Sequence, residues 1–148
     1  MNPSDPRTDP DQYATVWDLL NTSCDRDVAI AAPERDPFLY AGLRQHVTST
    51  VAALNERGIG RNDRVAIVLP NGPEMASSFL AVGAGATTAP LNPAYRKREF
   101  LFYLSDLGTK ALLLEEGSDS PARDAANELG ISVLELRTDP SQPAGAFE

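Results

Sequence analysis

The sequence has one cysteine and one histidine, the two residue types that most often act as a nucleophile, a base or a transition-metal ligand. Cys24 is the only cysteine, so no disulfide can form within the chain. Asp25 and Asp27 lie close to it in the sequence, and their negative charge disfavours the thiolate that a nucleophile needs. We interpret Cys24 as a structural or surface thiol, and a reactive cysteine is the alternative.

His46 is the only histidine and the second candidate for chemistry. It falls opposite the apolar side chains Leu43, Val47 and Val51 of a predicted helix. No other histidine could share a metal ion with it or complete a proton relay. We predict a solvated surface side chain here rather than a ligand or a base.

Charged side chains gather at two further places. Arg96, Lys97 and Arg98 form the only basic triplet, which could hold a phosphate or the tail of coenzyme A. Positive charge at a helix start is mildly unfavourable and runs of charge usually face water, so we predict a solvated helix start. Glu115 and Glu116 have neither a paired base nor a metal-ligand spacing. We therefore assign no catalytic residue and no metal site, and the cofactor-binding residues stay unknown.

The segment Gly83–Gly85 has two glycines around one alanine, as in a dinucleotide-binding turn. In such a turn the glycines open a helix whose N-terminus receives the pyrophosphate. Here they follow a predicted helix and precede a predicted strand, and no third glycine has the required spacing. We interpret them as residues that end the helix and allow close packing.

Composition narrows the class of partner. The chain has 148 residues, of which 42% are hydrophobic, enough for the core of one ordinary domain. Its net charge of -8 argues against a nucleic-acid partner. Met75–Tyr95 carries no charge, but its prolines, glycines and hydroxyl side chains oppose a membrane-spanning helix, so we expect no transmembrane segment. A single cysteine and the lack of a signal peptide favour a cytoplasmic location.

The elements that must position these side chains alternate between strand and helix. Arg64–Leu69 is a nearly continuous apolar run, typical of a strand buried on both faces of a parallel sheet. Further strands are predicted at 87–91, 111–114 and 132–136, with helices from Leu43 to Gly58, after Pro73, near 97–107 and at 121–129. Such alternation implies right-handed crossovers. We therefore predict an α/β fold, a mostly parallel sheet with flanking helices.

Other segments complete this organisation. A short helix at Val16–Leu20 and two strands, Val28–Ala31 and Phe38–Tyr40, precede the alternation. In the helix after Pro73 the apolar stripe is predicted at Met75, Phe79 and Val82.

The expected division is a flexible leader at 1–12, a partial α/β domain at 13–137 and a linker at 138–148. The last segment has no periodicity, and a chain that ends in a linker suggests truncation.

From Leu39 to Leu136 the segments resemble, in their order and in their amino-acid sequence, the start of the acyl-CoA synthetase family of adenylate-forming enzymes. The segments that carry the resemblance are Tyr40–Leu43, Asn62–Asn71, Glu74 and Phe79–Ala81. The sequence at Ala89–Tyr95, Glu99, Phe100 and Phe102–Asp106 is similar to that of the oxalate–CoA ligase and peroxisomal-synthetase-like branch. The resemblance implies the N-terminal part of the large domain of an ATP-dependent carboxylate–CoA ligase.

In that family a Ser/Thr/Gly-rich loop grips the ATP phosphates, a later acidic residue holds the ribose, and a lysine in a small C-terminal domain catalyses adenylation. None of these motifs occurs in this sequence, so no family active-site residue is carried over. ATP, Mg and CoA are implied for the full-length parent, and no cofactor is expected in this chain alone. Without groups aimed at the transferring phosphates, we expect it to be inactive by itself.

The partners that the resemblance implies are the remainder of the synthetase chain and, in the parent, a small carboxylate. The loops at Asn71 and Asn92 are expected at the carboxyl edge of the sheet, and part of the apolar surface is expected to be exposed. Two other functions stay open at this point. The chain could be a stand-alone non-catalytic α/β binding or regulatory module, or a short product that assembles with a separately made remainder.

Overall fold

A four-stranded parallel sheet forms the centre of the computed structural model, which describes residues 15–148. Its order is β4–β3–β5–β6, and all three neighbouring pairs are parallel. The strands are β3 (Arg64–Ile67), β4 (Thr87–Pro90), β5 (Ala111–Glu115) and β6 (Ser132–Leu136). The predicted α/β fold with a mostly parallel sheet is confirmed. The leader predicted at 1–12 lies outside the described residues.

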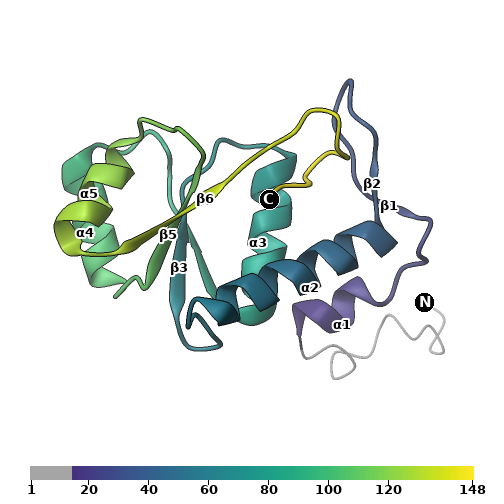
Figure 1. Cartoon of the computed structure of the whole chain (residues 1–148), viewed down its shortest axis with the longest axis horizontal. Helices are drawn as coiled ribbons and strands as arrows, with labels where there is room; N and C mark the ends of the chain where they lie inside the picture. Colours follow the sequence, from purple (N-terminus) through teal and green to yellow (C-terminus); the bar gives the residue numbers. More distant parts are fainter. Residues whose placement is uncertain (1–14) are drawn as a thin grey trace, which may run out of the picture.

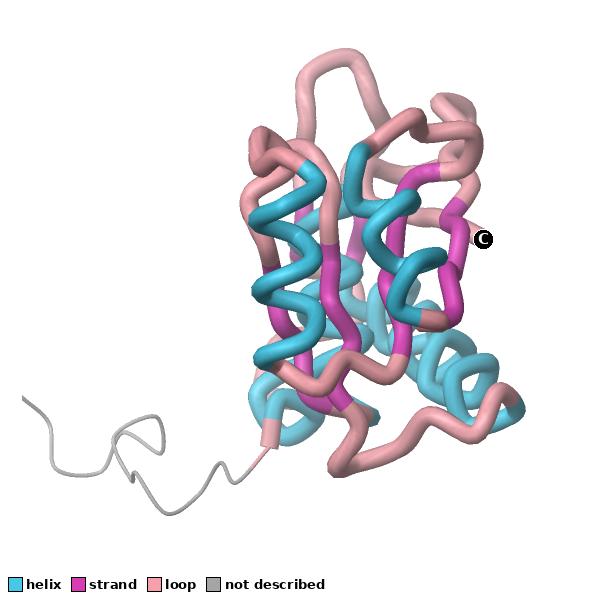
Figure 2. Tube along the Cα trace, turned by 90° about the vertical axis from the view of Figure 1, so that its left-hand side faces the viewer, coloured by secondary structure: helices cyan, strands magenta, loops and turns pink. Residues whose placement is uncertain are grey.

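Two pairs of helices cover the sheet, one pair on each face (Figure 1). The helices α2 (Tyr40–Glu56) and α3 (Pro73–Gly85) lie on one face, and α4 (Lys97–Asp106) and α5 (Pro121–Leu129) lie on the other. Figure 2 shows α4 and α5 side by side in front of the strands. The strands β3, β4 and β5 are thus each followed by a helix that packs back onto the sheet, as short right-handed crossovers require.

Side chains of the central strand alternate between these two faces. Val65 packs with Val82 of α3 in one core cluster. Its neighbour Ala66 packs with Phe100 of α4 and Ala125 of α5 in another. All five are at most 1% exposed. The three residues Val65–Ile67 are apolar because this part of β3 is buried on both sides, whereas Arg64 at the start of the strand is exposed.

Gly85, the last residue of α3, allows α2 and α3 to approach closely. A Cβ built on Gly85 would lie 2.9 Å from both Cγ atoms of Val51 in α2. Close packing is confirmed at Gly85, where α3 also ends, whereas a Cβ on Gly83 would make only ordinary contact. The predicted stripe of α3 is wrong at Phe79, which is 42% exposed, because the helix turns Ser78 and Ala81 toward the core instead.

The N-terminal elements form a small layer against α2 and α3. The helix α1 (Val16–Leu20) begins with a capping box between Thr15 and Asp18. The strands β1 (Val28–Ile30) and β2 (Phe38–Leu39) pair antiparallel, as the predicted hairpin requires. Tyr40, predicted to end the second strand, begins α2 instead.

The segment 138–148 packs against the domain, in contrast to the predicted linker. Ala144 is fully buried, and its N–H donates to the carbonyl of Asp36 at 2.8 Å. Ser77 of α3 donates its hydroxyl to the carbonyl of Gly145 at 2.6 Å, and a Cβ on Gly145 would lie 2.9 Å from the carbonyl oxygen of Pro73. The segment has no periodicity because its order comes from these long-range contacts.

No helix among residues 15–148 is long and apolar enough to span a membrane.

Candidate functional site

The carboxyl ends of the strands form a small pocket. Leu69 and Asn71 follow β3, Glu115 ends β5, and Thr138 follows β6; all of them line a cavity of about 140 Å³. Gly72 and Pro73 close it from the N-terminus of α3. This is the edge at which parallel α/β sheets place ligands. The prediction that the Asn71 loop lies there is confirmed.

The second predicted loop lies at the same edge. Leu91 donates its N–H to the carbonyl of Ile67 at 2.9 Å, so β4 ends beside β3. Asn92 follows, is exposed, and accepts the N–H of Ala94 with its side-chain oxygen at 2.9 Å. The Asn92 side chain therefore serves its own turn.

Acidic groups dominate this pocket. Glu74 and Glu115 both line it, and Glu74 forms an ion pair of 2.5 Å with Arg35 from the β1–β2 turn. The same guanidinium donates to the carbonyls of Gln142 and Pro143, at 3.3 and 2.9 Å. The guanidinium that is paired with Glu74 thus holds the hairpin, α3 and the tail together.

These residues do not fit a nucleoside triphosphate. The cavity is smaller than the roughly 300–1,000 Å³ of ordinary small-molecule sites. No cationic side chain of the described residues lines it, Glu74 is paired with Arg35, and the Glu115 carboxylate would repel a phosphate. Among residues 15–148, no three His, Cys, Asp or Glu side chains gather to hold a metal ion. We therefore derive no phosphate-transfer step at this pocket.

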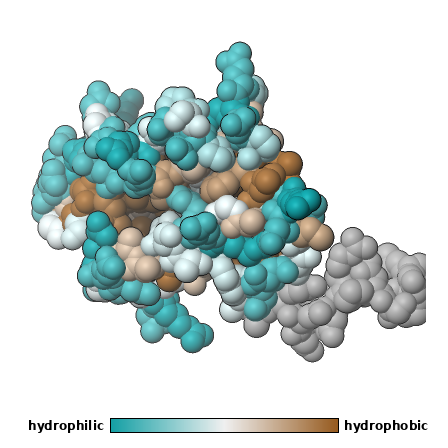
Figure 3. Space-filling model, turned by 45° about the vertical axis from the view of Figure 1, so that its right-hand side comes forward, coloured by the Kyte–Doolittle hydropathy of each residue, from teal (hydrophilic) through white to brown (hydrophobic). Residues whose placement is uncertain are grey.

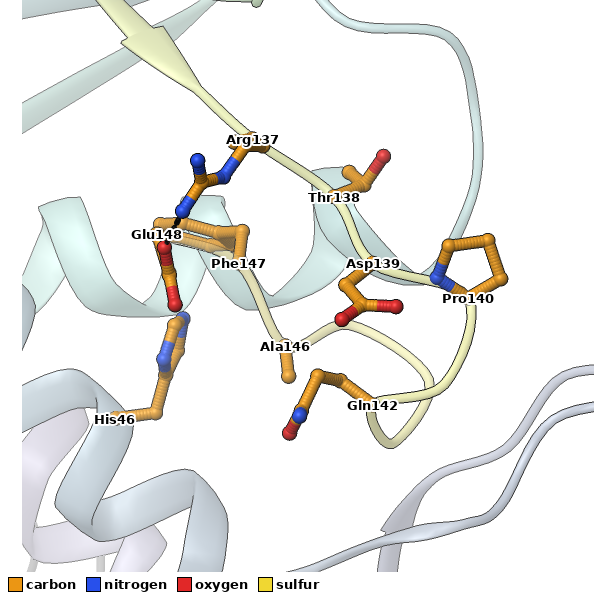
Figure 4. Close-up of a pocket in the computed structure, with 9 residues that line it drawn as sticks. All are labelled: His46, Arg137, Thr138, Asp139, Pro140, Gln142, Ala146, Phe147 and Glu148. Atoms are coloured by element: carbon orange, nitrogen blue, oxygen red, sulfur yellow. Dashed lines mark hydrogen bonds and ion pairs between the residues drawn. The ribbon is translucent and has the colours of Figure 1, made fainter.

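A larger cavity of about 470 Å³ lies between α2 and the tail (Figure 4). His46 and Phe147 form part of its wall, together with Arg137, Asp139 and Gln142. Arg137 is ion-paired with Glu148, which hydrogen-bonds to it and raises the pKa of the guanidinium. The pKa of Asp139 is lowered, chiefly because the backbone N–H of Ser141 donates to its carboxylate.

His46 is partly buried at this cavity, so the prediction of a solvated side chain is wrong. Its ring makes edge contacts with Phe38, at 5.7 Å between centroids, and with Phe147, at 4.3 Å. Its Nε2 is buried without a hydrogen-bond partner, and burial lowers the pKa of the imidazole. The side chain is covered by the hairpin and the tail, which sequence periodicity within one helix could not reveal.

The other candidates of the sequence lie at the surface. Cys24 is an exposed free thiol, as predicted. Arg96, Lys97 and Arg98 are exposed at the start of α4, as predicted. Lys97 forms an ion pair of 2.8 Å with Glu128 of α5, and the hydrogen bond to that carboxylate raises its pKa. None of these side chains lines either cavity.

Sequence reasoning missed Arg35 and Ser77. Arg35 lies in a predicted turn, where a charged side chain normally faces water, and Ser77 lies in a helix interior. Both donate to backbone carbonyls of the tail, at positions where any residue type offers the same acceptor, and Arg35 also pairs with Glu74, which lies 39 residues away in the sequence. No residue pattern could therefore have signalled these contacts.

A family model described as AMP-binding enzyme matches residues 16–146. Oxalate–CoA ligase of Arabidopsis thaliana is 48% identical over 106 residues, covering 70% of this chain and 21% of that protein. Oxalate–CoA ligase of Saccharomyces cerevisiae is 38% identical over 140 residues, covering 85% of this chain and 26% of that protein. The chain thus spans 21% and 26% of the length of these two relatives.

Solved structures agree with the sequence relatives. The crystal structure of apo MatB from Rhodopseudomonas palustris has a TM-score of 0.73 at 25% identity, covering 85% of this chain and 26% of that one. The N-terminal subdomain of Klebsiella oxytoca NpsA has the same fold, with a TM-score of 0.65 at 24% identity, covering 81% and 30%. With a family match over nearly all of its described residues and CoA ligases among its relatives, the chain belongs to the AMP-binding, adenylate-forming enzymes.

Proposed function

We propose that this chain is the N-terminal scaffold of an ATP-dependent carboxylate–CoA ligase, which forms an acyl-adenylate and then an acyl-CoA. The observation that carries the proposal is the match of the AMP-binding model to residues 16–146, together with 48% identity to an oxalate–CoA ligase. In this proposal the ligase acts on a small carboxylate, and oxalate is the first substrate to test because both relatives named above are oxalate–CoA ligases.

The geometry supports a scaffold role for the chain within this reaction. Its carboxyl-edge pocket is small and acidic, and the neighbouring cation is engaged by Glu74. Charge that develops on a transferring phosphate needs oriented donors and cations, so these must come from other parts of the ligase. In the proposal ATP, Mg and CoA bind the longer protein, and the remainder of the synthetase is the partner of this chain.

The test compares two purified proteins in one assay. The first is the 148-residue chain, and the second is the longest product of the reading frame that contains it. Carboxylate-dependent release of pyrophosphate is measured with ATP and Mg, first with oxalate and then with other small carboxylates. A mock purification from the same host removes the contribution of contaminating synthetases.

We expect pyrophosphate release from the longer product and none above the mock from the 148-residue chain. Robust turnover by the chain alone would overturn the scaffold role, because the chemistry would then lie in residues assigned none. A reading frame that stops at Glu148, with no separately made remainder in a pull-down from the host, would favour the stand-alone module instead.

A further inference from the structure

The loop between β3 and α3 contains Asn71 and Gly72, and no other asparagine of the chain is followed by glycine. Both residues are exposed. An asparagine side chain loses its amide group when the backbone nitrogen of the next residue attacks its Cγ and closes a succinimide ring. A glycine hinders this attack least, because it has no Cβ beside the nitrogen.

The structure leaves the attacking nitrogen free at this position. Among the hydrogen bonds between residues 15–148, none uses the N–H of Gly72 or the side chain of Asn71. The carbonyl of Gly72, in contrast, accepts the N–H of Ala76 at 3.1 Å as α3 begins. An N–H without an acceptor can give its proton to a base in the solvent without first breaking a hydrogen bond.

The other asparagines among residues 15–148 do not offer such a nitrogen. After Asn21 and Asn62 the next N–H donates to a backbone carbonyl, at 3.2 and 2.9 Å. Asn92 is followed by Pro93, which has no N–H. In two further cases the next N–H belongs to the hydrogen-bond ladder of α2 or α5, namely after Asn55 and Asn127. Structure and sequence thus single out the same asparagine.

We propose that Asn71 is a site of spontaneous deamidation at the carboxyl edge of the sheet. Hydroxide takes the proton of the Gly72 nitrogen, and this nitrogen forms a bond to the Cγ of Asn71. The bond between Cγ and Nδ2 breaks, and the side-chain nitrogen takes a proton from water and leaves as ammonia. Water then opens the succinimide. Cleavage of the ring at Cγ gives aspartate, and cleavage at the main-chain carbonyl carbon gives isoaspartate.

Either product changes the pocket at the carboxyl edge. Asn71 lines that pocket together with Glu74 and Glu115, so a carboxylate in its place adds a further acidic group to the wall. The isoaspartate also lengthens the main chain by one atom directly before α3 begins. The reaction therefore alters both the charge and the backbone of the segment that closes the pocket.

The test follows the 148-residue chain during incubation in a mildly alkaline buffer. Peptide mapping by mass spectrometry locates the gain in mass that accompanies loss of the amide. An isoaspartate methyltransferase with labelled S-adenosylmethionine reports the isoaspartate. The peptide that contains Asn92 is the internal control, because Pro93 cannot supply the attacking nitrogen.

The matched variant is Gly72→Ala, which places a methyl group beside the attacking nitrogen. A Cβ on Gly72 would lie 3.9 Å from its nearest neighbour, an oxygen of Glu74. The φ angle of Gly72 is 169°, which is extended backbone that alanine also adopts. The variant therefore fits the same loop, and thermal melts check that it is folded.

Long incubation also requires a check for aggregation. Hydrophobic side chains reach the surface among polar ones on one side of the molecule (Figure 3), and Phe102 is 63% exposed. Exposed apolar surface promotes association. The monomer is therefore isolated by gel filtration before digestion, and a sample unfolded in guanidinium chloride gives the rate of the same sequence without the fold.

We expect aspartate and isoaspartate to accumulate in the folded chain at Asn71, about tenfold more slowly in Gly72→Ala, with Asn92 unchanged. No product at Asn71 in the folded chain would overturn the proposal. Reaction in the unfolded sample would then show that the folded loop holds the two reacting atoms apart. Equal rates in the unmodified chain and in Gly72→Ala would also overturn it, because the reaction would not pass through the Gly72 nitrogen.

Discussion

The two faces of the sheet are covered by segments of different origin. The face under α4 and α5 is built by neighbouring parts of the chain, and its core side chains Phe100 and Leu104 are fully buried. The face under α2 and α3 also receives the hairpin and the tail, and its edge residue Leu134 stays half-buried. Local alternation of strand and helix can complete one face, whereas the other depends on contacts between distant segments.

Removing a large side chain from the α4–α5 face should have the largest effect. Phe100 is fully buried, so Phe100→Ala should lower the free energy of unfolding by about 3–5 kcal/mol. Urea denaturation followed by circular dichroism measures this. The matched change on the other face, Phe147→Ala, should cost clearly less because Phe147 is only partly buried. Equal losses would mean that the two faces contribute alike.

Adding one methyl group between α2 and α3 should destabilise less. The Cβ of Gly85→Ala would lie 2.9 Å from Val51, so we expect a loss of about 1–3 kcal/mol. A Cβ on Gly83 would lie 3.6 Å from Thr88, which is ordinary contact, so Gly83→Ala is the control and should be neutral or stabilising. Thermal melts compare the two. Val51→Ala should rescue Gly85→Ala, and absence of rescue would contradict the proposed clash.

Two neighbouring serines test whether a side-chain hydrogen bond holds the tail on α3. Ser77→Ala leaves the buried carbonyl of Gly145 without its donor and should cost about 1–2 kcal/mol. Ser78 is equally buried, but its hydroxyl has no partner, so Ser78→Ala should cost nothing or stabilise.

Hydrogen exchange should show faster opening at Ala144 in Ser77→Ala only. Unchanged exchange at Ala144 in Ser77→Ala would show that the tail is held without this bond.

The smallest effect concerns His46 and pH. Burial lowers the pKa of His46 in the folded state below the ordinary imidazole value of 6.5, so near and below that pH the unfolded state binds more protons. Its contribution to stability is therefore present above that value and declines as the pH falls through it. Unfolding free energies between pH 8 and pH 5.5 should decline less in His46→Phe than in the unmodified chain. An identical pH dependence would place the His46 imidazole in water in both states.

Much of the scaffold could be predicted because its signals are local. The strands at Arg64–Ile67 and Ser132–Leu136 and the helix at Pro121–Leu129 follow from apolar runs, a helix-starting proline and terminal glycines. The surface positions of Cys24 and Lys97 followed from their neighbours in the sequence. The face that α3 buries did not, because two buried serines occupy positions that an apolar stripe would claim.

The sequence by itself determined the order of strands and helices, the parallel sheet and the family. Hydrophobic periodicity, helix caps and family motifs are all properties of short segments. Only the tertiary structure decided how the hairpin and the tail pack against the domain. The burial of His46, the junction at Arg35 and the pairing of Glu148 with Arg137 join residues far apart along the chain. Some of their partners are backbone carbonyls, which every residue carries, and the others are side chains that only the folded chain brings close, so a local pattern of residues does not record these contacts.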